Sequence, residues 1–265
     1  MTARAVDKDA SAQKGRTQDK SRLAVVRRTG DYRRSAIWVG ILYIIATVAP
    51  VVSFGAWGTL TGGRGILTNA AGHESQVITF VLLNLAMAIA VAGVAFMMYP
   101  VLRRITETTV EEGLAHWYVG TRVTEGALSI VALIAVLAFL PLSRDFITAG
   151  TPAASYFQTG GAALQSTVDL AFALAGTVVA VGAAMLYYLL YQSKLVPRWL
   201  SGWGLVAAPL FVVASLSLLW TGDPNSTLST VFYAPMGVQE MVLAVLLIAR
   251  GFDPTPLEAH VTEQR

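Results

Sequence analysis

Residues 118–142 read YVGTRVTEGALSIVALIAVLAFLPL, and this stretch indicates the fold class of the whole chain. Its last sixteen residues, from Ala127 to Leu142, contain one serine and no charged side chain. A membrane-spanning helix requires about 20 predominantly apolar residues, and the stretch meets that length. Its first two turns carry Arg122 and Glu125. A charge pair in such a helix must either reach the membrane edge or have a role inside the bundle.

Five other stretches have the same character, so the chain is predicted to be all-α, a polytopic membrane helix bundle with six transmembrane helices. Of its 265 residues 55% are hydrophobic and only 13% charged, against about 25% charged in ordinary soluble domains. The chain contains no cysteine, which excludes disulfides and thiolate chemistry. The predicted spans are Ala36–Trp57, Val77–Pro100, Tyr118–Leu142, Leu164–Gln192, Trp199–Trp220 and Thr230–Ala249.

The distribution of basic residues predicts that both termini are cytoplasmic. With the N-terminus inside, sixteen of the nineteen Lys and Arg residues fall on the cytoplasmic side, as the positive-inside rule requires. All six tryptophans lie at predicted span ends, and Tyr99, Tyr187, Tyr188 and Tyr191 lie near inner ends, as in an interfacial aromatic belt. We therefore predict a multi-pass protein of the cell inner (plasma) membrane. Its basic residues flank spans, so no nucleic-acid partner is predicted.

Three segments follow from this topology. Residues 1–35 hold ten Lys/Arg and few large apolar side chains, a composition typical of a basic disordered cytoplasmic tail, or of a segment whose 22–34 part lies on anionic lipid. Residues 36–250 form the six-helix transmembrane domain, and residues 251–265 a short cytoplasmic tail. Residues 58–76 and 143–163 are predicted outer connections, and residues 103–112 a short charged helix at the inner interface.

Four charged residues fall inside the predicted spans: Arg122, Glu125, Asp169 and Glu240. Each costs about 2.5–3.5 kcal/mol at mid-membrane on an insertion scale, so such residues usually face a bundle interior or water. Glu240 is central in the last span. One arginine against three carboxylates gives a formal charge of −2, and the simplest hypothesis pairs Arg122 with one carboxylate and leaves Glu240 protonated unless water reaches it.

Tyr118, Arg122, Glu125 and Ser129 are separated by 4, 3 and 4 residues, which places them on one face of a helix. Beyond Ser129 this face is apolar. The stripe predicts a polar pocket open to the cytoplasmic half of the membrane and closed outward. The alternative is an interfacial charge pair that only extends to the membrane surface.

The candidates for a ligand or ion pocket are the residues of the stripe, Glu240, and in addition Asp169, Asn84 and Tyr43. The alternative for Asp169 is an outer interfacial residue or a helix start. Most uncharged polar residues are expected to join helices by hydrogen bonds. The three histidines lie outside the spans without metal-ligand spacing. No catalytic residue, metal site or cofactor is predicted. Small residues at helical spacing in the fourth span (Ala173, Gly176, Ala180, Ala184, with Gly182 beside them) predict close helix packing.

Several short motifs occur in order along the spans. Gly40–Tyr43 opens the first span, Arg122-x-x-Glu125 the third, residues 191–201 (YQSKLVPRWLS) join the fourth and fifth, and Pro235-x-x-x-x-Glu240 precedes Arg250-Gly251. Over roughly residues 33–251 this order resembles the bacterial membrane-protein family catalogued as domain of unknown function 4386. Ser201 stands where such proteins commonly have glycine. The resemblance implies the six-span architecture and brings no assigned reaction.

Three hypotheses for function remain open. The first is a helix bundle that binds a small molecule or ion, in transport or sensing, with a proton-coupled form as one version. The second is a structural or accessory membrane protein without transport or catalysis. The third is an intramembrane enzyme, which ranks last because no nucleophile–base set is visible. The predicted partners are the lipid bilayer and, under the first hypothesis, a small-molecule or ion ligand; no pattern indicates an oligomeric state.

Overall fold

A computed structural model describes residues 2–61, 65–149, 154–221 and 227–257. Within these ranges the chain forms helices and no strands, and six helices are long and apolar enough to cross a membrane. The all-α prediction and the six spans are therefore confirmed. The long helices are α1 (Thr2–Thr61), α3 (Glu74–Ile105), α4 (Thr109–Ala149), α5 (Ala154–Ser193), α6 (Arg198–Thr221) and α7 (Thr227–Ala249); the short α2 (Ile66–Asn69) and η1 (Ala70–Gly72) lie between α1 and α3.

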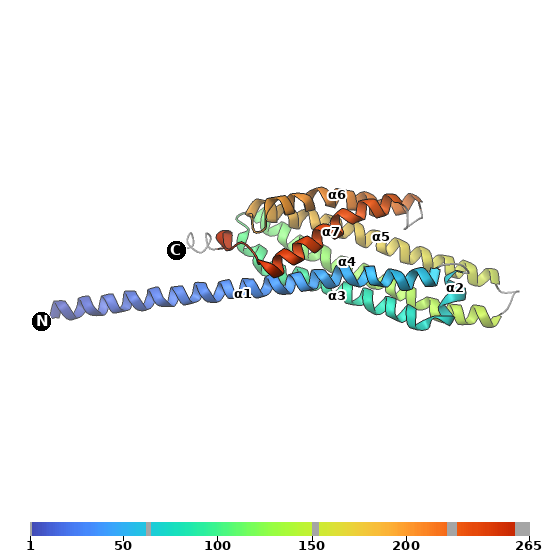
Figure 1. Cartoon of the computed structure of the whole chain (residues 1–265), viewed down its shortest axis with the longest axis horizontal. Helices are drawn as coiled ribbons and strands as arrows, with labels where there is room; N and C mark the ends of the chain where they lie inside the picture. Colours follow the sequence, from blue (N-terminus) through green and yellow to red (C-terminus); the bar gives the residue numbers. More distant parts are fainter. Residues whose placement is uncertain (1, 62–64, 150–153, 222–226, 258–265) are drawn as a thin grey trace.

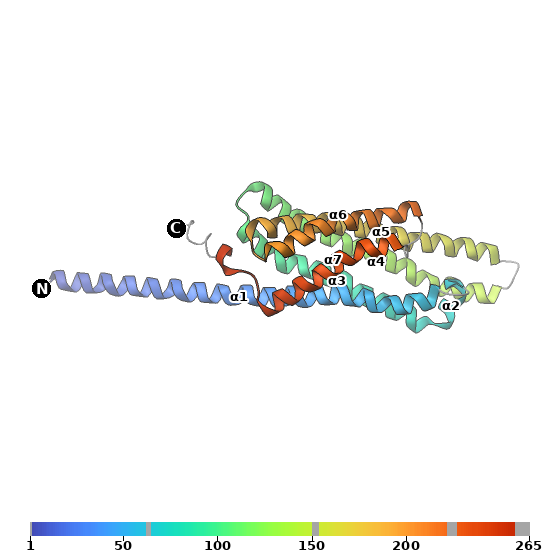
Figure 2. The ribbon, with the colours of Figure 1, turned by 45° about the horizontal axis from the view of Figure 1, so that its top comes forward.

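The six long helices form a closed ring in which each packs against two neighbours. The order around the ring is α1, α3, α4, α5, α6 and α7, and α7 packs back against α1. Figures 1 and 2 show α1 and α7 together at the end of the bundle nearest the N-terminus, and α7 diverging from α1 toward α6 at the other end. We call the first the proximal end and the second the distal end.

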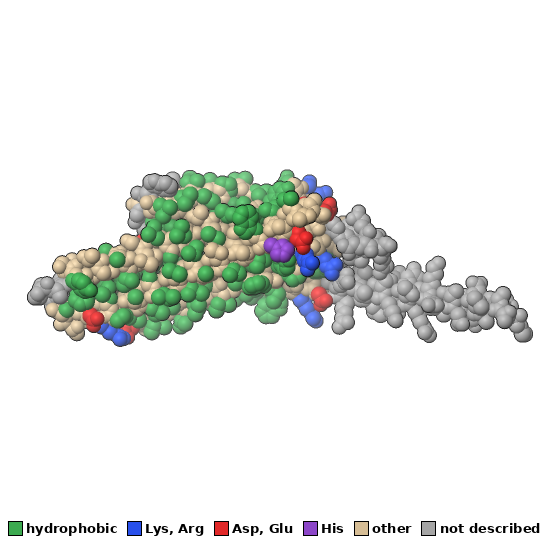
Figure 3. All heavy atoms as spheres, turned by 180° about the vertical axis from the view of Figure 1, so that it is seen from behind, with side chains coloured by type: hydrophobic (Ala, Val, Ile, Leu, Met, Phe, Trp, Pro, Cys, Tyr) green, Lys and Arg blue, Asp and Glu red, His purple; other side chains and the backbone are tan. Residues whose placement is uncertain are grey.

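Apolar side chains cover the middle of the outer surface. Val206 is 67% exposed and Ile89 65% exposed, values that a protein in water avoids for a whole band of residues. Figure 3 shows the hydrophobic band on one face, with Lys, Arg, Asp and Glu gathered at its two ends. Trp38, Trp117 and Trp199 are each more than half exposed and lie at the proximal end. This arrangement matches an apolar bilayer core with an aromatic belt at its edge.

Several element boundaries differ from the sequence-based expectation. Helix α1 extends back to Thr2, through the N-terminal segment predicted to lack regular structure. A segment with few large apolar residues can still form a charged helix. Helix α4 begins at Thr109, nine residues before the predicted span, because Thr108 and Glu111 form a capping box with bonds of 3.2 Å in both directions. No separate interfacial helix therefore forms there.

The predicted outer connection 143–163 is mostly helical, since α4 continues to Ala149 and α5 starts at Ala154. Residues 62–64 and 150–153 lie outside the described ranges.

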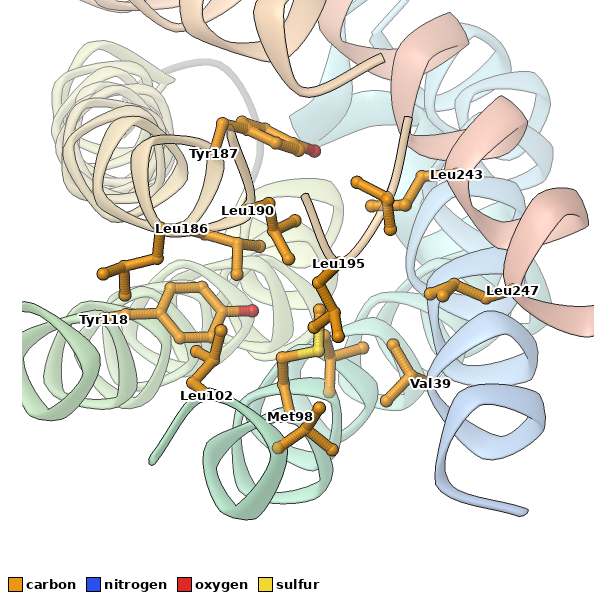
Figure 4. Packing of buried hydrophobic residues seen from close by; sticks show 14 of the residues in the cluster. Val39, Met98, Leu102, Tyr118, Leu186, Tyr187, Leu190, Leu195, Leu243 and Leu247 are labelled. Atoms are coloured by element: carbon orange, nitrogen blue, oxygen red, sulfur yellow. The ribbon is translucent and has the colours of Figure 1, made fainter. Parts of the chain in front are cut away.

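The proximal half of the ring is filled by a hydrophobic core. Figure 4 shows Leu102, Leu186, Leu190 and Leu195 packed between α3, α5 and the α5–α6 connection, beside Tyr118. Each of these leucines is fully buried. Tyr187, predicted to be interfacial, is also fully buried here. The proximal end is therefore closed by side chains.

Glycines set the closest helix contacts. A Cβ atom at Gly40 of α1 would lie 2.6 Å from Cγ1 of Ile248 and 2.7 Å from the carbonyl oxygen of Ala244, both in α7. Gly176 in α5 faces Ser215 of α6 in the same way, and Gly182 faces Thr121 of α4. The small residues predicted in the fourth span thus allow α5 to pack closely against both α6 and α4. Such close packing is expected in a membrane, where lipid supplies no hydrophobic force between helices.

Arg33 of α1 joins the proximal ends of α1 and α7. Its guanidinium donates hydrogen bonds to the carbonyl oxygens of Leu247 (3.0 Å), Ile248 (2.7 Å) and Ala249 (3.2 Å). The Leu247 carbonyl also accepts the Gly251 N–H at 3.1 Å. All three carbonyls lie in the last turn of α7, at the negative end of its dipole. Gly251 follows in the left-handed region with φ 81°, the usual glycine signal that ends a helix.

Replacing Arg33 by alanine should lower the stability of the protein by about 1–3 kcal/mol, because three carbonyls lose a charged donor. Thermal unfolding in detergent of Arg33→Ala and Arg34→Ala would measure this. Arg34 is exposed one position away and is the matched control. Equal melting temperatures for the two variants would contradict the assignment of Arg33 as a helix clamp.

Candidate functional site

Arg122 lies between two carboxylates from different helices. Its Nη1 atom donates to Oε2 of Glu125 at 2.9 Å, and its Nη2 atom donates to Oε1 of Glu240 at 3.2 Å. Glu125 is one turn away on α4, whereas Glu240 belongs to α7. The ion pairs therefore tie α4 to α7, two helices that are not neighbours in the ring. The expectation that Arg122 pairs with only one carboxylate is replaced by a bridge to both.

These three side chains are inside the protein. The exposed fraction of the side chain is 3% for Arg122, 10% for Glu125 and 16% for Glu240. Arg122 is the fourteenth residue of α4, because the helix begins at Thr109, so it lies well beyond the first turns. The alternative of an interfacial pair at the membrane surface does not fit this burial, since such a pair keeps its charged groups in water.

A cavity of about 740 Å³ adjoins the Arg122 bridge. All six long helices contribute to its walls, and Arg122, Glu125 and Glu240 form its proximal boundary. From there it extends to Trp57 of α1 and Ser229 of α7 at the distal end. Its volume lies in the range of about 300–1,000 Å³ typical of small-molecule sites.

The direction of this cavity differs from the prediction. The apolar face beyond Ser129 was expected to close the pocket on the distal side and leave it open on the cytoplasmic, proximal side. The hydrophobic core fills the proximal side instead, and the cavity extends distally. The stripe on α4 gave the wrong direction because the distal walls come chiefly from α1, α5 and α7.

Tyr43 and Tyr118 lie beside Arg122. The guanidinium carbon of Arg122 is 5.8 Å from the centre of the Tyr118 ring, within cation–π range. Both tyrosines are at most 2% exposed. The Tyr118 hydroxyl lies within range of Tyr43 and of Arg122, without a well-aligned hydrogen bond to either. Only Tyr43 lines the cavity. Tyr118 therefore supports the bridge from the core side.

Ser129 and Asn84 have structural partners. The hydroxyl of Ser129 donates to the Glu125 carbonyl at 2.9 Å, and Ser129 does not line the cavity. The Nδ2 atom of Asn84 donates to Oγ of Ser53 at 2.9 Å and to the Phe80 carbonyl at 2.9 Å. Asn84 and Ser53 both line the cavity wall between α3 and α1, as expected for a hydrogen bond that joins two helices.

Asp169 shares the cavity but not the ion-pair bridge. It is the sixteenth residue of α5, so it does not start a helix. Gly182 of α5 contacts Thr121 of α4, which is next to Arg122. Asp169 precedes Gly182 by thirteen residues, so at about 1.5 Å per residue it lies about 20 Å further toward the distal end of α5. Its carboxylate accepts a hydrogen bond from Gln165 at 2.9 Å. It forms no ion pair with any described residue.

Two features of the site lie outside the predicted pocket candidates, although Gln239 and Thr47 are among the weaker polar positions of the spans. The hydroxyl of Tyr187 donates to Oε1 of Gln239, whose Nε2 atom donates to the Leu200 carbonyl at 3.2 Å. These hydrogen bonds hold α7 against α5 and α6 immediately before Glu240. Thr47 of α1 lies in the cavity wall within range of the Glu240 carboxylate. One turn separates Thr47 from Tyr43, so both lie on one face of α1.

Residues 38–251 match a family described as Domain of unknown function (DUF4386). The match covers most of the chain and all three residues of the bridge. The chain belongs to this family. The resemblance drawn from the order of the short motifs is thereby confirmed. Searches of curated proteins and of solved structures give no match. The description of the DUF4386 family states no function, so function must be argued from the site.

Removing Arg122 alone should destabilise this DUF4386 protein by about 3–5 kcal/mol, because two buried carboxylates lose their counter-charge. Arg122→Met is the test, and the triple variant Arg122→Met, Glu125→Gln, Glu240→Gln should recover much of the loss. Unfolding in detergent, monitored by circular dichroism, measures both.

Arg103→Met is the matched control. Its ion pair with Glu112 is 66% and 45% exposed at the two side chains, so its removal should cost at most about 1 kcal/mol. Equal losses in Arg122→Met and Arg103→Met, or a triple variant less stable than Arg122→Met, would contradict a buried charge bridge.

Proposed function

We propose that this protein binds a small molecule in the distal cavity, as part of transport or sensing across the membrane. The observation that carries the proposal is a cavity of about 740 Å³ whose mostly apolar walls end at the Arg122, Glu125 and Glu240 side chains. A binding site of this kind has apolar walls and a few convergent polar groups. Packing alone does not require such a space, because protein interiors are normally filled.

The orientation of the cavity bears on the kind of function. With the cytoplasmic termini that the Lys and Arg distribution predicts, the proximal end faces the cytoplasm and the distal end faces outside. The hydrophobic core then separates the cytoplasm from the bound molecule, and the cavity receives ligands from the outer side. Such a state is one of the two that an alternating-access transporter visits, and it is also the geometry of an outward-facing sensor.

A ligand-binding role predicts that filling the cavity abolishes ligand stabilisation. Gly237 lines the cavity three residues before Glu240, and an added Cβ atom there meets nothing within 4 Å. In thermal unfolding with a panel of small cationic, neutral and anionic amphiphiles, at least one compound should raise the melting temperature of the wild-type protein. A ligand at 100 times its Kd stabilises by about 2.7 kcal/mol. The Gly237→Phe variant should lose this response.

Gly120→Phe provides the control. Gly120 is an exposed glycine in the proximal third of α4 and does not line the cavity, so this variant should respond like the wild-type protein. If no class of compound stabilises the wild type, or if Gly237→Phe responds equally well, the accessory role without a ligand is the better description.

A further inference from the structure

The charged side chains that line the cavity are predominantly acidic. Arg122 is the one basic residue among the described lining residues, against Glu125, Glu240 and Asp169. The formal sum with all groups ionised is −2. Two of the carboxylates lie at the proximal boundary and the third lies about 20 Å away along α5, so negative charge is present at both ends of the space.

Arg122 is already paired with two carboxylates. Its two terminal nitrogens each donate one hydrogen bond, to Glu125 and to Glu240. An anion at this site would meet these two carboxylates, whose combined charge exceeds that of the guanidinium. Glu240 is the most exposed member of the bridge, and it accepts only one of the arginine hydrogen bonds. The carboxylate of Glu240 therefore remains accessible to a cationic group from the cavity side.

An unpartnered polar group and several aromatic rings are also present in the wall. Tyr43 is 2% exposed and lines the cavity beside Glu240. Its hydroxyl lies within range of Tyr118, but no well-aligned hydrogen bond joins it to a described residue. Further along the cavity Trp57 stacks on Phe80 at 4.6 Å, and Phe211 packs edge-on to Tyr233 at 4.5 Å between ring centres. Aromatic faces attract organic cations and also pack against apolar bodies.

The cavity reaches the lipid-facing surface between α1 and α7. Val51 of α1 and Thr230 and Ala234 of α7 line the cavity and are also exposed. Their neighbours Val52 and Val231 are 59% and 57% exposed, as in the apolar band that faces lipid. Figures 1 and 2 show the two helices diverging in this region. A ligand with an apolar body can therefore approach from the lipid.

We propose that the ligand is a lipophilic organic cation that enters between α1 and α7 and places its positive group against Glu240 and its apolar body against the aromatic wall. This inference rests on the proposed function and names its ligand class. Asp169 attracts the same positive charge at the distal end of the cavity. Neutral and anionic molecules of equal size lack this attraction, because they leave the net negative charge of the cavity uncompensated.

The test compares two probes of matched shape and opposite charge, tetraphenylphosphonium and tetraphenylborate. Their binding to the full chain in uncharged lipid nanodiscs is measured by equilibrium dialysis. Tetraphenylphosphonium should bind at least about tenfold more tightly, a difference of about 1.4 kcal/mol. Glu240→Gln and Asp169→Asn should each weaken its binding severalfold. Asp145→Asn, an exposed residue near the distal end that does not line the cavity, should leave binding unchanged.

Asp169→Asn keeps the test valid if Glu240→Gln fails to fold, because Asp169 has no part in the Arg122 bridge. Equal binding of the two probes, tighter binding of tetraphenylborate, no binding of tetraphenylphosphonium, or loss of binding in Asp145→Asn to the same extent would each overturn the cation assignment. A neutral or anionic compound that stabilises the wild type but not Gly237→Phe would leave the proposed function standing and overturn only the ligand class.

Discussion

The rest of the structure depends on the cost of keeping one guanidinium and two carboxylates away from water. An isolated charge inside a membrane protein is unfavourable by several kcal/mol, and it is tolerated when counter-charges lie within hydrogen-bond distance. Arg122 meets that condition with Glu125 at 2.9 Å and Glu240 at 3.2 Å. Because Glu240 belongs to α7, the condition holds only while α4 and α7 keep their positions on opposite sides of the ring.

The bridge also marks a boundary between two kinds of interior. On its proximal side lie fully buried leucines and Tyr187 in a filled core. On its distal side the same six helices surround a cavity. Glycines explain part of this difference, since Gly40 brings α1 and α7 into contact at the proximal end. A filled half supplies rigidity, and an unfilled half supplies room for a ligand.

The sequence predicted the six spans and the identity of three bridge residues because both rest on local composition. A run of apolar residues identifies a span, and a charge within it identifies a candidate site. The sequence left open which carboxylate pairs with Arg122, because 118 residues separate Arg122 from Glu240 and only the ring order brings them together. The direction of the cavity was wrong for the same reason: it depends on Trp57, Phe211 and Tyr233, which belong to other helices. Helix α4 starts nine residues before the predicted span because the capping box at Thr108 begins a helix there, in a segment whose charged residues a hydropathy argument leaves out.

The clamp at Arg33 has a mechanical consequence for α1 and α7. Three hydrogen bonds and the Gly40 contact hold these helices together at one end, so a change in their crossing angle acts as rotation about a fixed pivot. At about 1.5 Å per residue, Glu240 lies about 14 Å from Ala249 and Ser229 about 30 Å from it. If α7 rotates about this pivot, its distal end moves about twice as far as Glu240. A wide separation of α1 and α7 at the surface would then accompany a smaller displacement of Glu240 in the charge bridge.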